Sequence, residues 1–65
     1  MIFVVVSPMD HAGKRFQPGD IIHVGEEEFM VWTRDLQRAK ARMVMSQEDA
    51  QQLRAAILDG SFVAK

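Results

Sequence analysis

The sequence contains no cysteine among its 65 residues, so disulfide bonds and thiolate chemistry are excluded. A chain of this length is close to the size at which one apolar core is only just sufficient for stable folding. Without disulfides, the remaining means of stabilisation are regular apolar patterning and oligomerisation. We therefore expect a single domain over residues 1–65 that forms a homodimer.

The sequence also lacks an excess of charge of one sign and any long apolar run. A formal net charge of −1 provides no general attraction to nucleic acid or to a membrane surface. The apolar run at residues 1–6 has no basic leader and is too short for a signal peptide or a membrane span. These features predict a soluble, cytoplasmic protein without a membrane partner.

Apolar residues are plentiful: they make up 48% of the sequence, which is enough for a core. Five of them are methionines, a high number for this length. We favour the interpretation that they fill the core as flexible side chains. The alternative is an adaptable contact surface.

The segment from Ser46 to Gly60 carries signals for both ends of a helix. Ser46 is a typical N-cap, and Asp49, three residues later, completes an acidic form of the capping box. Gly60 stands where a left-handed residue commonly ends a helix. The pattern predicts a helix over residues 47–59. Its apolar stripe recurs at helical spacing and comprises Ala50, Leu53, Ala56 and Ile57.

The first half of the chain predicts strands. The β-branched and aromatic run at residues 2–6 is typical of a strand that is buried on both faces, with the helix at 47–59 as its cover. Because an unpaired edge this apolar would promote aggregation, we expect this strand to be central or paired across a dimer. Residues 9–20 are expected to form a loop, with Pro18-Gly19 at the centre of a type II turn.

Residues 20–33 are expected to form a hairpin, with strands at about 20–24 and 27–33 and a type II′ turn at Gly25-Glu26. Residues 34–45 fit two patterns. Leu36, Ala39, Lys40 and Met43 would fit a helix capped by Thr33, whereas the alternation after Ala39 fits a strand. We favour a turn at 34–37 followed by a strand at about 40–45, and the helix stays open as the alternative.

Together these patterns predict an α+β fold: a small antiparallel sheet, or a partly closed barrel, with one helix packed on it. A short closing strand is expected at residues 62–64.

Two stretches resemble a family of very small phage and prophage proteins of unknown function, encoded near the head and tail morphogenesis genes of Mu-like phages. The first is His11-Ala12-Gly13-Lys14, followed by Pro18-Gly19-Asp20 and an alternating strand. The second is the capped helix with Asp49-Ala50 and Leu53, followed by Gly60 and Phe62-Val63. The resemblance covers roughly residues 2–24 and 44–64. In the family pattern the strand after Pro-Gly-Asp leads almost directly to the capped helix. This sequence differs from the pattern because residues 25–43 lie between the two. The resemblance implies a phage-type origin in a bacterial host cell rather than an activity, because no catalytic motif belongs to that pattern.

Candidate catalytic and metal-binding residues are few. The two histidines, His11 and His23, lack the compact ligand spacing of zinc motifs, and we interpret them as a turn residue and a solvent-facing strand residue. The run Glu26-Glu27-Glu28 is interpreted as a solvated hairpin tip, because a chain this short encloses little volume for an acid–base site. We expect no catalytic residue, no metal and no cofactor, and hence no enzyme activity.

The remaining functional signal is a concentrated basic stretch next to the single tryptophan. The residues we expect to contact a partner are Phe29, Met30, Trp32, Arg34, Arg38, Lys40 and Arg42. We predict a non-enzymatic phage or prophage accessory protein that acts by protein–protein contact, in particle assembly or by binding and inhibiting a host factor. The alternative is a small nucleic-acid-binding module that uses the basic stretch for phosphates and Trp32 for base stacking.

Overall fold

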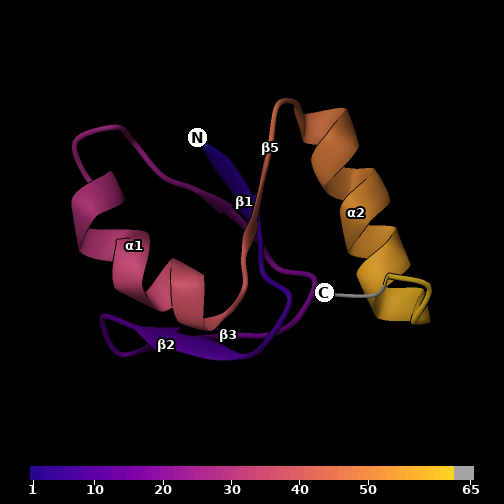
Figure 1. Ribbon diagram of the computed structural model, residues 1–65, viewed down its shortest axis with the longest axis horizontal. Helices are drawn as coiled ribbons and strands as arrows, with labels where there is room; N and C mark the ends of the chain where they lie inside the picture. The colour runs from indigo at the N-terminus through magenta and orange to yellow at the C-terminus, as the bar shows by residue number, and fades with distance from the viewer. Residues whose placement is uncertain (63–65) are drawn as a thin grey trace.

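The computed structural model describes residues 1–62, which form an α+β fold with five strands and two helices (Figure 1). The strands lie in two separate antiparallel sheets, one in the order β4-β1-β5 and one made of β2 and β3, and within these residues no barrel closes. The elements in chain order are β1 (Ile2–Val4), β2 (Met9–His11), β3 (Lys14–Phe16), β4 (Ile21–His23), α1 (Phe29–Arg38), β5 (Arg42–Val44) and α2 (Gln47–Asp59).

The strand β1 is the centre of the fold, as its apolar sequence predicts. It pairs antiparallel with β4 on one side and with β5 on the other. Alternate side chains point to opposite faces, so Phe3 and Val5 join the core beneath α1, while Val4 points to the face on which α2 packs. Figure 1 shows β1 between the two helices.

The helix α2 has the bounds that its end signals predict. The side chain of Ser46 accepts a hydrogen bond from the Asp49 N–H at 3.1 Å, and Gly60 ends the helix in the left-handed conformation with φ of 83°. Ala50 is buried, and the other three residues of the stripe are half-buried. The predicted cover of β1 by this helix is therefore confirmed.

The prediction of a strand at 27–33 after a type II′ turn is wrong, because residues 29–38 form the helix α1. The predicted turn at 34–37 is wrong for the same reason, and Thr33 lies within the helix rather than at its cap. Leu36 and Ala39 are buried against the sheet at helical spacing, which a strand could not achieve. The run of glutamates at 26–28 precedes the helix, where negative charge is favourable.

The prediction of a loop over residues 9–20 is wrong for its first part, where β2 and β3 form a hairpin. Its turn at Ala12-Gly13 has φ of 52° and 79°, and two successive positive values fit a tight hairpin. Met9 is buried in the core and stands opposite Phe16, which fixes the hairpin to the rest of the molecule. The type II turn is confirmed: Gly19 has φ of 95°, and the Asp20 N–H donates to the carbonyl of Gln17.

The other predicted strands are present but shorter. The segments 2–6, 20–24 and 40–45 contain β1, β4 and β5. In the predicted closing strand at 62–64, residue 62 is not in a strand, and residues 63 and 64 lie outside the described residues. Neither helix within residues 1–62 has the length and apolar character needed to cross a membrane.

Candidate functional site

The helix α1 carries most of the predicted contact residues, and its periodicity distributes them over three faces. One face looks onto β1 and β5, a second packs on the β2–β3 hairpin, and a third is exposed to solvent. Phe29 and Thr33 lie on the first face, and Trp32 and Asp35 lie on the second. The exposed third face carries Met30, Val31, Arg34 and Arg38.

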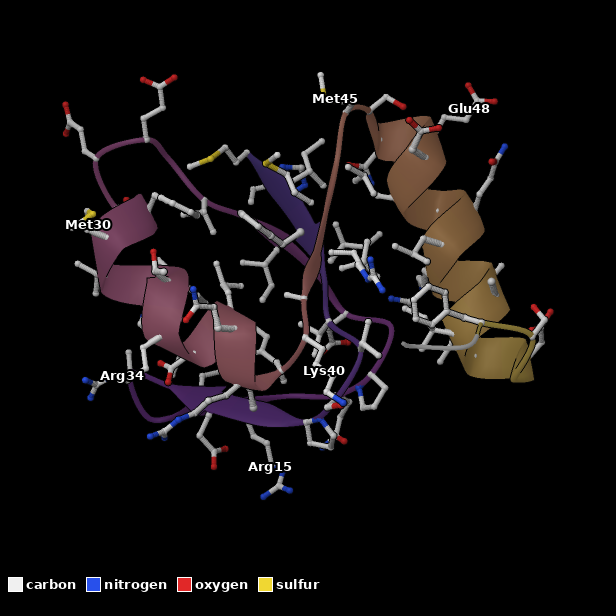
Figure 2. The ribbon with its side chains drawn as sticks, viewed as in Figure 1. Arg15, Met30, Arg34, Lys40, Met45 and Glu48 are labelled. Atoms are coloured by element: carbon white, nitrogen blue, oxygen red, sulfur yellow. The ribbon has the colours of Figure 1, made fainter. Side chains whose placement is uncertain are left out.

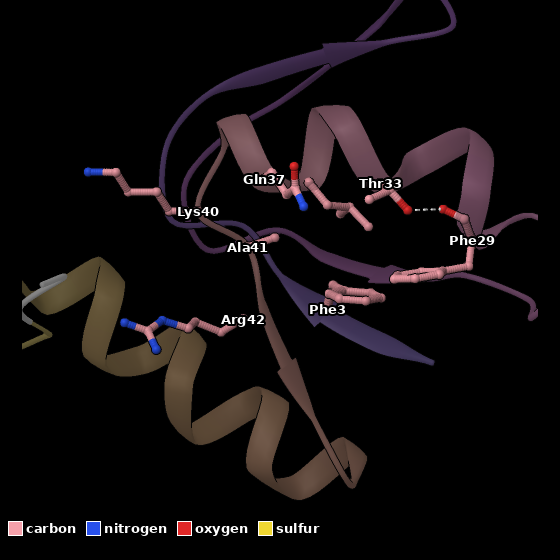
Figure 3. Close-up of a pocket in the computed structure, with 8 residues that line it drawn as sticks. Phe3, Phe29, Thr33, Gln37, Lys40, Ala41 and Arg42 are labelled. Carbon is pink, nitrogen blue, oxygen red and sulfur yellow. Dashed lines mark hydrogen bonds between the residues drawn. The ribbon is translucent and has the colours of Figure 1, made fainter.

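Between α1 and β5 lies an open groove of about 420 Å³ (Figure 3). Phe3 and Phe29 stack within it, with ring centroids 6.0 Å apart and an angle of 11° between the ring planes. Thr33 donates its hydroxyl hydrogen bond to the carbonyl of Phe29 at 2.7 Å, so no free polar hydrogen of this side chain is directed into the groove. The groove is therefore mainly apolar. Its lining is completed by Leu36, Gln37, Lys40, Ala41 and Arg42.

The two basic residues at the groove direct their charges away from it. Figure 3 shows Lys40 extending outward and Arg42 reaching toward α2. The guanidinium carbon of Arg42 lies 5.6 Å from the centre of the Phe62 ring, which fits a cation–π contact. Anion binding inside the groove is consequently not supported by these two side chains.

The solvent-exposed face of α1 combines apolar and basic side chains, and we call it the outer face (Met30, Val31, Arg34, Arg38). Met30 is 83% exposed and Val31 is 68% exposed, although both are large and apolar. Arg34 and Arg38 lie one and two turns further along the same face and are also exposed. Methionine and arginine are enriched in protein–protein interfaces, whereas a solvated helix face is usually polar.

The hairpin face of α1 contains a compact cluster around His11. Its Nδ1 lies 2.7 Å from Asp35 Oδ2, and its ring stacks on Trp32 with centroids 3.8 Å apart. Phe16 packs edge-on against Trp32, with the ring centroids 5.8 Å apart. Trp32 is thus half-buried, with one ring face occupied by His11, and it also lines an open pocket beside β3 and β4.

The predicted contact residues are not brought together as one site. Met30, Arg34 and Arg38 share the outer face, Phe29 is half-buried in the groove, and Trp32 faces the hairpin. Arg38, Lys40 and Arg42 would line a single face only in a continuous strand, and the structure has no such strand. Arg38 ends α1, Lys40 has a left-handed conformation with φ of 53°, and only Arg42 lies in β5.

Sequence reasoning missed the role of two kinds of residue: Phe3 and Leu36, which line the groove, and Asp35, the partner of His11. It gave an exposed methionine surface only as the alternative. Of the five methionines only Met9 is buried, so the preferred interpretation as core filling holds for that residue alone. The helical spacing of Trp32, Leu36 and Ala39, together with the glutamates before it, was the signal that could have placed α1 correctly.

The chemistry available to these residues is limited. Within residues 1–62, no three histidine, aspartate or glutamate side chains are grouped so that they could hold a metal ion. Hydrogen bonds from the side chain and the backbone of Ser61 lower the pKa of the Asp59 carboxyl. That carboxyl lies at the end of α2 and belongs to helix termination rather than to the groove or the outer face.

Comparison of the protein with family models, with curated proteins and with solved structures finds no match. The resemblance to the phage and prophage family therefore stays a prediction, carried by the turn and cap residues quoted for it. Function has to be argued from the surfaces of the molecule itself.

Proposed function

We propose that this protein is a non-enzymatic accessory protein of phage or prophage type that acts by contact with another protein in the bacterial cytoplasm. The contact would serve particle assembly or the inhibition of a host factor. The observation that carries the proposal is the outer face of α1, where Met30 and Val31 are exposed beside Arg34 and Arg38.

The chemistry of the outer face defines the partner. Burying two large apolar side chains is favourable on association, and the two guanidinium groups require carboxylates or other acceptors opposite them. The partner is therefore a protein surface with an apolar centre and acidic groups around it. Charge complementarity of this kind mainly sets the rate and the specificity of association.

Photo-crosslinking tests this proposal directly. A photo-reactive amino acid is introduced at Val31 on the outer face, and as a control at Gln52, which is exposed on α2. In bacterial cells that carry a Mu-like phage, residue 31 should crosslink to one defined protein, and residue 52 should not. Adding Arg34→Glu and Arg38→Glu should abolish the product, because the substituted carboxylates would repel an acidic partner.

The proposal fails if residue 31 produces no protein adduct, or if residues 31 and 52 produce the same adducts. It also fails if the only product is two copies of this chain, because the partner would then not be another protein. An adduct that a nuclease removes would instead support nucleic acid as the ligand.

Binding of nucleic acid is the second candidate, and one observation favours it. Figure 2 shows Arg15, Arg34 and Lys40 on the lower side of the molecule, where they could contact phosphates. Anisotropy of a labelled single-stranded oligonucleotide, measured over a range of salt concentrations, tests it. Binding should weaken with a slope of about 0.7 per phosphate contact in a plot of log affinity against log salt. Absence of binding at low salt would exclude this candidate.

A further inference from the structure

The strand β5 lies at an edge of the sheet, and within residues 1–62 only β1 pairs with it. The main-chain groups of successive residues in a strand point to opposite sides. The Val5 N–H donates to the carbonyl of Asp20 on the β4 side, so odd-numbered residues of β1 bond toward β4 and even-numbered ones toward β5. In β5, Arg42 and Val44 stand opposite even-numbered residues of β1. The N–H and C=O of Met43 therefore point to the open edge.

This open edge is apolar and accessible. Met43 is 59% exposed and Met45, just after the strand, is 88% exposed. Protein edge strands usually carry a proline, a bulge or a charge at their centre, which prevents pairing with another chain. The strand β5, Arg42-Met43-Val44, contains no proline and pairs with β1 without a bulge, and its one charge is at Arg42 rather than at the central residue Met43. In Figure 1, β5 crosses in front of β1 between the two helices, with neither helix drawn over it.

We propose that a second copy of this chain pairs antiparallel with β5 about a two-fold axis beside Met43. In this register Met43 stands opposite Met43 of the second copy, and Ala41 stands opposite Met45 of the second copy. The two three-stranded sheets then join into one continuous sheet. This interface does not use the outer face of α1, so it goes beyond the proposed function and stands independently of it.

The groove between α1 and β5 fits this arrangement. Met43 points to the same face of the sheet as Phe3, because the two are partners in the β1–β5 register, and Ala41 packs against the same core. Continuing the strand to residue 45 in the dimer directs Met45 to this face as well. Directly opposed side chains in an antiparallel pair lie about 5 Å apart. Met45 of the second copy is therefore placed beside Ala41, which lines the groove. A methionine side chain is flexible and suits an irregular apolar space of this kind.

The charges along this edge support a second copy as the occupant. Lys40 precedes β5, whereas Glu48 and Asp49 follow it in the first turn of α2. Figure 2 shows Lys40 in the lower middle of the molecule and Glu48 at its upper side. Antiparallel pairing brings the basic start of each β5 toward the acidic end of the other, and the two-fold axis produces this attraction twice.

The substitution Met43→Lys tests the interface. Two ammonium groups would stand opposite each other at the two-fold axis, so the dimer should become a monomer. Molar mass is measured by light scattering coupled to size exclusion, and circular dichroism verifies the fold. Leu58→Lys is the matched control, because Leu58 is 60% exposed but lies on α2. This control should remain a dimer.

A charge-pair experiment tests the register itself. Met43→Glu alone should also be monomeric, whereas an equimolar mixture of Met43→Lys and Met43→Glu should recover the dimer, because opposite charges then meet at the axis. Met45→Ser removes the side chain that fills the groove and should raise the dimer Kd about tenfold or more. This milder variant tests the interface even if a charge at position 43 prevents folding.

Three results would overturn the dimer: a wild-type chain that stays monomeric at NMR concentrations, a Met43→Lys dimer as stable as the control, or a mixture that stays monomeric. None of them depends on whether residue 31 crosslinks to another protein. Failure of the dimer and failure of the proposed function can therefore be told apart.

Discussion

His11 joins the β2–β3 hairpin to α1 through two side chains. Its ring stacks on Trp32, and its Nδ1 is within hydrogen-bond distance of the Asp35 carboxylate. Both partners lie more than twenty residues further along the chain. The turn beside His11 can be recognised in the sequence, but these contacts cannot, because they require α1 to be a helix that packs on the hairpin.

At the residue scale we predict that His11→Ala lowers the free energy of unfolding by about 1–2 kcal/mol, from the loss of the stacked ring and the hydrogen bond. Urea unfolding followed by Trp32 fluorescence measures it, because Trp32 is the only tryptophan. His23→Ala is the matched control. His23 is exposed, and its side chain makes no hydrogen bond within residues 1–62, so the change should be within about 0.5 kcal/mol. Equal losses for both variants would contradict a structural role for the cluster.

At the element scale, α1 and α2 differ in how they are encoded. The two ends of α2 are specified locally, by the hydrogen bond between Ser46 and Asp49 and by Gly60. The N-cap position of α1 is Glu28, whose side chain makes no capping hydrogen bond, and two β-branched and two aromatic residues lie within the helix. Such residues have strand propensity, so local reasoning favours a strand. The packing of Leu36 and Ala39 into the core outweighs this local strand propensity and stabilises the helix.

For this helix we predict that Val31→Ala raises the free energy of unfolding by about 0.5 kcal/mol. Val31 is exposed, so the substitution loses little packing, and alanine has the higher helix propensity. Chemical denaturation of the monomeric Met43→Lys background measures the effect without a contribution from dimerisation. In a strand the same substitution would be destabilising, so a clear loss of stability would argue against a helix at 29–38.

At the scale of the whole molecule, β1 is shared by two apolar layers. Phe3 points to the layer under α1, and Val4 points to the layer under α2, and both side chains are buried. If β1 detached from one layer, apolar side chains of the other layer would also be exposed to solvent. The two helices are therefore coupled through one three-residue strand, although they make no extensive contact with each other.

This coupling predicts that Val4→Ala lowers the free energy of unfolding by about 2–3 kcal/mol and leaves unfolding as a single transition. Far-ultraviolet circular dichroism reports both helices, and Trp32 fluorescence reports the α1 side. The two signals should change at the same urea concentration. A circular dichroism transition that precedes the fluorescence transition would mean that α2 unfolds separately, and would refute the coupling.

The sequence by itself determined the α+β class, the helix at 47–59, the type II turn at Gly19 and the central place of β1. These features follow from local rules, since caps, turn residues and a continuous apolar run have the same meaning in any fold. Only the tertiary structure decided that residues 29–38 are helical and that residues 9–16 form a hairpin. It also separated the predicted contact residues over three faces of α1 and the segment that follows it, because which side of a helix is buried depends on the elements that pack against it.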